Sequence, residues 1–195
     1  MTAWELARAT GFLAYLAFTA STVAGLMLSS KYLGKKAGRN LTLVHEAAAI
    51  AGLVVVVLHA WAILNDSFFE FDLASILVPG MSPYDPLWVG MGVFAAWVGA
   101  IVIGSFYVRK KIGPRNWRRI HYLSPIMFVA MTMHGLMAGT DSQNTAALAL
   151  YSAGGGSALA LTGYRIVVGM AAARKKKAKA AKRAAAPASA VSAES

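Results

Sequence analysis

Five long apolar stretches, separated by polar segments, dominate the pattern of hydrophobic and polar positions along this chain. A helix needs about 17–25 mostly apolar residues to cross a bilayer, and each stretch is of that length. We therefore predict an all-α, integral membrane helical bundle. Its five transmembrane helices are expected near residues 9–30, 41–64, 86–108, 118–139 and 147–171.

Composition favours this class over a soluble globule. Of the 195 residues, 57% are apolar and only 14% are charged, and the mean hydropathy is +0.54. Soluble domains average about 25% charged residues. The chain has no cysteine, which excludes disulfides, thiolate metal sites and iron–sulfur clusters. A redox cofactor would have to be held by histidine or bound without covalent ligation.

The charged residues indicate an orientation. Of the 19 Lys and Arg residues, four lie in 31–39, six in 109–119 and seven in 174–183. The segments 65–85 and 140–146 carry acidic residues and no Lys or Arg. Because basic loops stay cytoplasmic, we predict that the N-terminus lies outside and the C-terminus inside. The net charge of +11 then reflects topology and attraction to membrane lipid, and we expect no nucleic-acid partner.

We divide the chain into a membrane domain, residues 1–171, and a polybasic cytoplasmic tail, residues 172–195. The tail ends in low-complexity sequence rich in Ala and Ser, which predicts disorder. The first apolar run is too long for a signal peptide and lacks a basic start, so we expect it to be a retained span. Residues 68–81 are apolar but too short to span, and we expect them along the outer interface or across the end of the bundle.

All four histidines fall inside two of the predicted spans, His45 with His59 and His121 with His134. At about 1.5 Å per residue, their spacings place imidazoles at two depths roughly 20 Å apart. In the predicted topology the two helices run in the same direction. His45 and His121 then share the inner depth, and His59 and His134 share the outer depth. Since haem iron accepts two neutral imidazoles, we predict two bis-histidine haems, one at each depth.

Other interpretations of the histidines stay open. Intramembrane histidines also act as hydrogen-bonded packing residues or as proton relays in a small transporter. A non-haem metal site would need three or four ligands at one depth. Each depth supplies two histidines, and the neighbouring Glu46 points about 100° away from His45 on its helix.

Helix geometry sets a condition on the haem hypothesis. At 3.6 residues per turn, His59 returns to within about 40° of the face of His45. His134, in contrast, falls about 140° from His121. The span 118–139 therefore needs a kink or a local change in winding, which Pro125 can supply.

Haem also needs cations for its propionates and small neighbours for its faces. We predict that Arg118 or Arg119, beside His121, binds a propionate of the inner haem. Anchoring of the helix by the positive-inside rule explains these arginines equally well. Glycines that are candidates for close approach to the macrocycle are Gly52, Gly90, Gly92, Gly99 and Gly104.

These features resemble the ferric reductase transmembrane domain, and the resemblance covers about residues 5–171. Paired histidines 14 and 13 residues apart on alternate helices are similar to that family's pattern. Asn116–Leu123 (NWRRIHYL) is similar to its W-R-x-x-H motif, and Thr10–Gly11 and Gly25–Leu26 are similar to its first core helix. The superfamily includes NADPH oxidases, ferric reductases and the haem-binding membrane subunit of the bacterial methionine sulfoxide reductase system.

The resemblance implies that His45 and His121 ligate an inner haem b, and that His59 and His134 ligate an outer one. It implies a multi-pass electron-transfer subunit in a bacterial plasma membrane. The family usually has six spans, whereas five are predicted here. Some members carry a flavin and NADPH domain, but this sequence contains no G-x-G-x-x-G loop. The electron donor would be a separate flavoprotein or quinol, and the acceptor ferric iron or a redox partner protein. A haem-binding sensor or assembly subunit is the alternative function.

Overall fold

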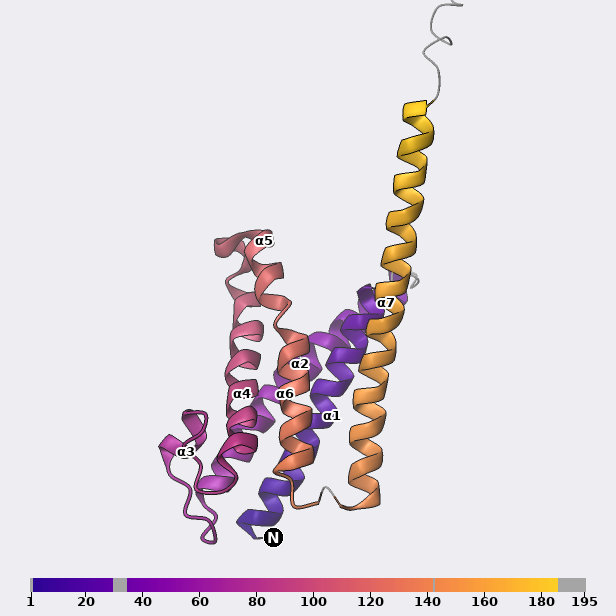
Figure 1. The fold of residues 1–195 in the computed structure, drawn as a ribbon. Coiled ribbons are helices and arrows are strands. Elements are labelled where there is room, and N and C mark those ends of the chain that lie inside the picture. The colour runs from indigo at the N-terminus through magenta and orange to yellow at the C-terminus, as the bar shows by residue number, and fades with distance from the viewer. Residues whose placement is uncertain (1, 30–34, 142, 186–195) are drawn as a thin grey trace, which may run out of the picture.

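The computed structural model describes residues 2–29, 35–141 and 143–185, and within these ranges it contains helices and no strands. Figure 1 shows the long helices side by side, with the short helices α3 and α5 near opposite ends of the bundle. The helices are α1 (Ala3–Ser29), α2 (Lys35–Leu64), α3 (Leu73–Leu77), α4 (Pro86–Tyr107), α5 (Arg109–His121), α6 (Ser124–Met137) and α7 (Thr145–Ala185).

Four of these helices, α1, α2, α4 and α7, are long and apolar enough to cross a membrane. The pair α5 and α6, bent by 43° at a short break, provides a fifth candidate when counted as one span. Large apolar side chains cover the outer faces, and Val57, Trp61 and Leu159 are 63%, 56% and 74% exposed. An apolar surface this extensive is costly in water and suits a lipid environment. The predicted all-α class is confirmed, and four to five candidate spans stand beside the five that we predicted.

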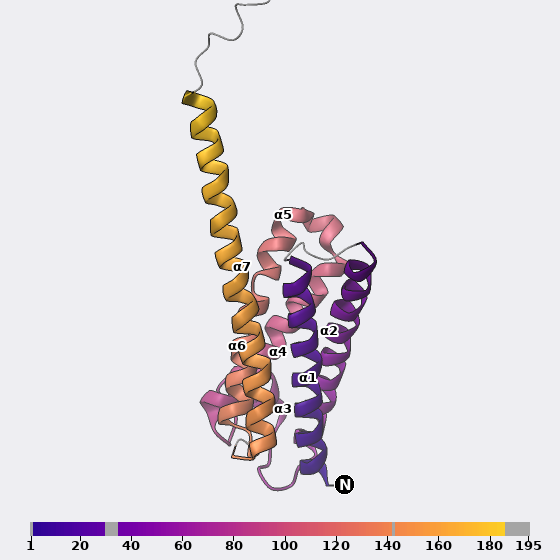
Figure 2. The same ribbon diagram turned by 90° about the vertical axis from the view of Figure 1, so that its right-hand side faces the viewer.

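The three basic regions gather at one end of the bundle. Figures 1 and 2 show the start of α2, helix α5 and the C-terminal part of α7 toward one end. The N-terminus, α3 and the connection from α6 to α7 lie at the other end. Helices α2 and α6 therefore run in the same direction, as the charge pattern predicts.

The basic segment 109–117, which we expected to be a loop, is helical instead. Helix α5 runs through it to His121, with an interruption at Gly113, whose φ is +80°. Glycine adopts a positive φ at little steric cost, so the chain turns there and resumes a helix at once. The polar composition indicated a loop, but Lys and Arg are also good helix formers.

The described part of the predicted tail, residues 172–185, is helical and continues α7. Helix α7 continues through the polybasic run to Ala185. This run consists mainly of Ala, Lys and Arg, which have high helix propensity. Residues 186–195 lie outside the described residues.

The core lies between α1, α4 and α6. Its buried side chains are Phe18, Ala95, Val98, Val102, Met127 and Ala130. A Cβ atom at Gly52 would lie 3.1 Å from the Phe18 ring, so this glycine allows α1 and α2 to pack closely. Gly52 therefore faces Phe18, and its predicted role beside a macrocycle is not supported by this packing.

The segment 68–81 folds back against the end of the bundle. Its short helix α3 is capped by Asp72, whose carboxylate accepts hydrogen bonds from the side chain and backbone N–H of Ser75. These bonds, the side-chain one first, hold the pKa of Asp72 below its usual value. The indole N–H of Trp97 donates to the carbonyl of Leu77 at 2.8 Å and so ties the segment to α4.

Candidate functional site

The structure brings the four histidines together in the two predicted cross-helix pairs. The ring centroids of His45 and His121 lie 6.0 Å apart, with an interplanar angle of 82°. Those of His59 and His134 lie 6.4 Å apart, with an angle of 79°. Each pair joins α2 to the α5–α6 segment at one depth of the bundle. The partners across the helices, and not the neighbours along one helix, therefore form the candidate sites.

Backbone carbonyls of neighbouring helices hold three of the four imidazoles. Each of the three donates a hydrogen bond through Nδ1–H, at 2.8 to 2.9 Å. The bonds run from His45 to Ser21, from His59 to Ala7, and from His134 to Trp88. Because the carbonyl can only accept, the proton resides on Nδ1 and a neutral ring has its Nε2 lone pair available. Such a bond fixes the ring orientation and raises the basicity of a ligating imidazole.

A glycine lies four residues after each of these carbonyls, one helical turn along the same helix. The pairs are Ser21 with Gly25, Ala7 with Gly11, and Trp88 with Gly92. A Cβ atom at these glycines would lie 3.1 Å from His45, 3.2 Å from His59 and 2.7 Å from His134. We call each combination of carbonyl and glycine a histidine seat. The missing side chain leaves room for the ring, and the carbonyl above it sets the ring's tautomer.

The two seats on α1 match the two histidines on α2. Gly11 and Gly25 are 14 residues apart, as are His45 and His59. Since α1 and α2 run antiparallel, the seat at Gly11 serves His59 and the seat at Gly25 serves His45. One helix thus supplies a matched seat at each of the two depths.

The ring geometry fits a metal ion held between two imidazoles. A first-row metal bound to two nitrogens at about 2 Å each, from opposite sides, separates the ring centroids by about 6 Å. Both observed separations agree with this value. Within the described residues there is no group of three or more His, Cys, Asp or Glu side chains that could hold a metal ion. A metal ion at either pair would therefore find two protein ligands among these residue types in the described part of the chain, namely the two histidines.

The inner pair is built differently from the outer pair. No described residue forms a hydrogen bond with the His121 ring, which instead stacks on Trp117 with centroids 5.5 Å apart. The indole N–H of Trp117 is buried and has no partner within the described residues. Arg118 and Arg119 lie in the same last turn of α5, and both are exposed. Both arginines are close to His121 in the sequence. No contact that the structure shows identifies a ligand for them.

The break between α5 and α6 meets the condition set by the 13-residue histidine spacing. The two helices are bent by 43°, with Tyr122 and Leu123 between them. Pro125 lies in the first turn of α6 and cannot donate to the carbonyl of His121, four residues earlier. The predicted bend near Pro125 is confirmed, and it allows His121 and His134 to face the same helix.

Replacing Pro125 with alanine should restore the missing donor and straighten the break. A continuous helix would turn His134 about 140° away from His121. Under the haem hypothesis, haem with two histidine ligands should be lost at one depth, and the low-spin signals in electron paramagnetic resonance measure this loss. Pro86, also in the first turn of a helix, provides the matched control, and Pro86→Ala should leave both signals intact. Equal effects of the two changes would contradict this explanation.

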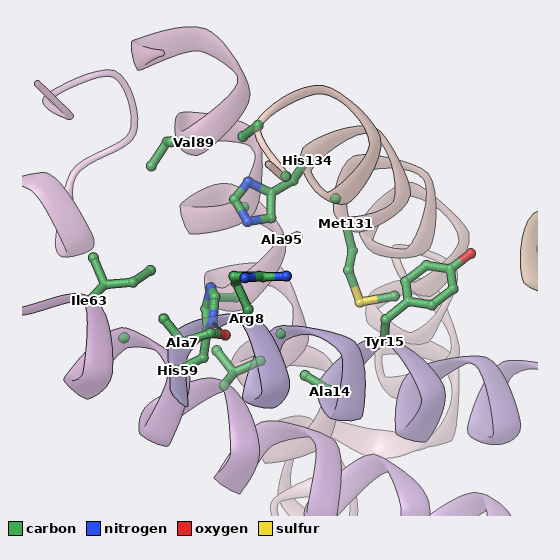
Figure 3. Close-up of a pocket in the computed structure, with 18 of the residues that line it drawn as sticks. Ala7, Arg8, Ala14, Tyr15, His59, Ile63, Val89, Ala95, Met131 and His134 are labelled. Atoms are coloured by element: carbon green, nitrogen blue, oxygen red, sulfur yellow. Dashed lines mark hydrogen bonds between the residues drawn. The ribbon is translucent and has the colours of Figure 1, made fainter. Parts of the chain in front are cut away.

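The outer pair borders a cavity between the helices. Figure 3 shows His59 and His134 approaching it from different helices, with Arg8 and Met131 beside it. Most of its lining is apolar and comes from α1, α2, α4 and α6, while Phe71, Ser75, Ile76 and Tyr84 contribute from the segment between α2 and α4. An apolar cavity with a few convergent polar groups is typical of a cofactor site.

The sequence analysis missed two features of this site. Arg8 lines the outer cavity and forms an ion pair with Asp141, 133 residues away in the chain. Gly92 was expected to approach a macrocycle, but it seats His134 instead. Gly11 and Gly25 belong to the segments that resemble the first core helix of the family. That resemblance was the one indication in the sequence that these two glycines belong to the site.

The chain was compared with protein-family models, with curated proteins and with solved structures, and none of these matches it.

Proposed function

We propose that this protein is a multi-pass membrane cytochrome b that carries electrons across a bacterial plasma membrane. In this proposal α5 and α6 form one of five spans, and the positive-inside rule puts the polybasic end of α7 inside and the N-terminus outside. His45 and His121 hold the inner haem b, and His59 and His134 hold the outer one. A separate flavoprotein or quinol supplies electrons, and ferric iron or a redox partner protein accepts them.

The observation that carries this proposal is the pairing of seated imidazoles at two depths. Ring centroids 6.0 and 6.4 Å apart leave room for one metal ion between each pair. Nδ1–H bonds to backbone carbonyls leave Nε2 as the ligating nitrogen in three of the four rings. Intramembrane ionisable groups are expensive, so four of them arranged this way point to function.

Haem iron with two imidazole ligands gains and loses one electron and has no open coordination position. The protein's own residues then do three things. The seats fix the imidazoles, the apolar cavity wall excludes water, and the two depths establish a route through the bilayer. Phe18 and Met127 fill the core between the helices.

Electron transfer across vesicles tests this function. The full chain, loaded with haem, is inserted into lipid vesicles that contain ferricyanide, and dithionite is added outside with valinomycin present to balance charge. We expect the trapped ferricyanide to be reduced, and we expect His59→Ala to stop this although the inner pair remains. Reduction that continues unchanged in His59→Ala vesicles would contradict transfer through both depths. A purified protein that binds no haem would instead favour a proton-relay transporter.

A further inference from the structure

Arg8 is an exception to the charge pattern of this chain. Of the 19 Lys and Arg residues, 17 lie in the three basic segments, and Arg8 is one of the two outside them. It lies in the first third of α1, and Figure 1 shows the N-terminus at the end of the bundle opposite α5 and the C-terminal part of α7. In the proposed orientation this end faces outside, where Lys and Arg are less frequent than in cytoplasmic loops, so Arg8 is unusual there.

The position of Arg8 connects it to the outer histidine pair. It follows Ala7, whose carbonyl accepts the Nδ1–H bond of His59. Among the residues that line the outer cavity, all within the described part of the chain, Arg8 is the sole Lys or Arg. Figure 3 shows its side chain at the cavity together with His59 and His134. A negatively charged group in this cavity would find no other cation in the wall.

The ion pair with Asp141 uses one edge of the guanidinium. Nε and one terminal nitrogen, Nη2, donate to the two carboxylate oxygens of Asp141. A guanidinium has five N–H donors, so the edge formed by Nη1 and Nη2 can still bind a second carboxylate. No described residue accepts a hydrogen bond from Nη1. Asp141, whose side chain is 20% exposed, therefore orients Arg8 without exhausting its donors.

We propose that Arg8, oriented by Asp141, is the carboxylate-binding site of the outer cavity and takes a propionate of the haem ligated by His59 and His134. This inference rests on the proposed function. It differs from the prediction for Arg118 and Arg119, which concerns the inner haem. Asp141 is a positioning residue, and Arg8 makes the contact.

The test compares haem b with its dimethyl ester, in which both carboxylates are blocked. Both are titrated into the full chain carrying His121→Ala, so that bis-histidine absorbance reports the outer site. We expect Arg8→Ala to weaken haem b binding about tenfold or more, because a hydrogen-bonded charge pair is lost. Binding of the dimethyl ester should change by less than about twofold, and Arg8→Lys should recover part of the affinity for haem b. Asp141→Asn should have a smaller effect than Arg8→Ala.

The controls separate this proposal from a purely structural ion pair. Arg165, the other arginine outside the basic segments, is exposed on α7, and Arg165→Ala should leave both titrations unchanged. If Arg8→Ala and Asp141→Asn weaken haem b and the dimethyl ester equally, the pair only fastens α1 to the α6–α7 connection and the proposal is overturned. No effect of Arg8→Ala on either ligand also overturns it. Failure of the unmodified Arg8 chain to bind haem would overturn the proposed function itself.

Discussion

Alanine at His134 is expected to remove the outer haem's two-histidine signal and leave the inner one in place. His59→Ala should remove the same signal, because His59 and His134 form one pair across the helices. His45→Ala and His121→Ala should remove the other signal. The measurement is the number and the g-values of low-spin haem species, together with a reductive titration that resolves two midpoint potentials.

Double variants make this prediction specific to the pairing. His59→Ala combined with His134→Ala should lose no more than either single change, since both act on one site. His59→Ala combined with His45→Ala should lose both signals, although these two residues lie on the same helix. Added imidazole should restore the missing ligand in the His134→Gly variant, since it fits the space left by the side chain. Evidence that His45 and His59 together ligate one haem would contradict the pairing across helices.

Alanine at Gly92 is expected to disrupt the outer site through the seat of His134. The added Cβ would lie 2.7 Å from Nδ1 of His134, closer than real Cβ contacts, so the ring or the helix must shift. Overpacking of this kind typically costs about 1–3 kcal/mol. We expect a changed midpoint potential and weaker binding of the outer haem, with the inner haem unaffected, measured by the same reductive titration.

Gly104 supplies the matched control on the same helix. Gly104 was also a candidate for close approach to a macrocycle, but it lies about 18 Å along α4 from Gly92. A Cβ there meets nothing within 4 Å, so Gly104→Ala should leave the outer potential unchanged. It should also stabilise α4 slightly, because alanine is the better helix former by about 1 kcal/mol. At Gly11 an added Cβ would lie 3.2 Å from His59, so the effect of Gly11→Ala on the outer potential should lie between those of Gly92→Ala and Gly104→Ala. If Gly104→Ala and Gly92→Ala shift the outer potential equally, the seat does not position His134.

The helices and the histidine pairs could be predicted from the sequence. Both depend on the length of the apolar stretches, the distribution of charge and regular helix geometry. The length of the apolar stretches indicates the candidate spans, and the loop charges predict the direction of each helix. Once the direction of each helix is set, residues at equal depth on parallel helices must pair. The bend near Pro125 was also predictable, since 13 residues do not return His134 to the face of His121.

The seats and the Arg8 site could not be predicted in the same way. A seat needs a carbonyl, a glycine and a histidine from two different helices, and the rotation of one helix against its neighbour is not encoded in either stretch alone. The partner of Arg8 lies 133 residues away, on the short connection before α7. The helical part of the tail is different, because Ala, Lys and Arg favour a helix whereas the low complexity of the sequence that follows them favours disorder.

The central claim is that this chain holds two haems b, each between two histidines. Its most direct test is the haem content and the low-spin spectrum of the purified full chain, taken as haem per chain by the pyridine haemochrome method with electron paramagnetic resonance on the same sample. We predict two haems b per chain and two low-spin signals, both lost when His45 and His59 are changed together. A chain without haem, or one whose haem is five-coordinate and survives that double change, would contradict the claim.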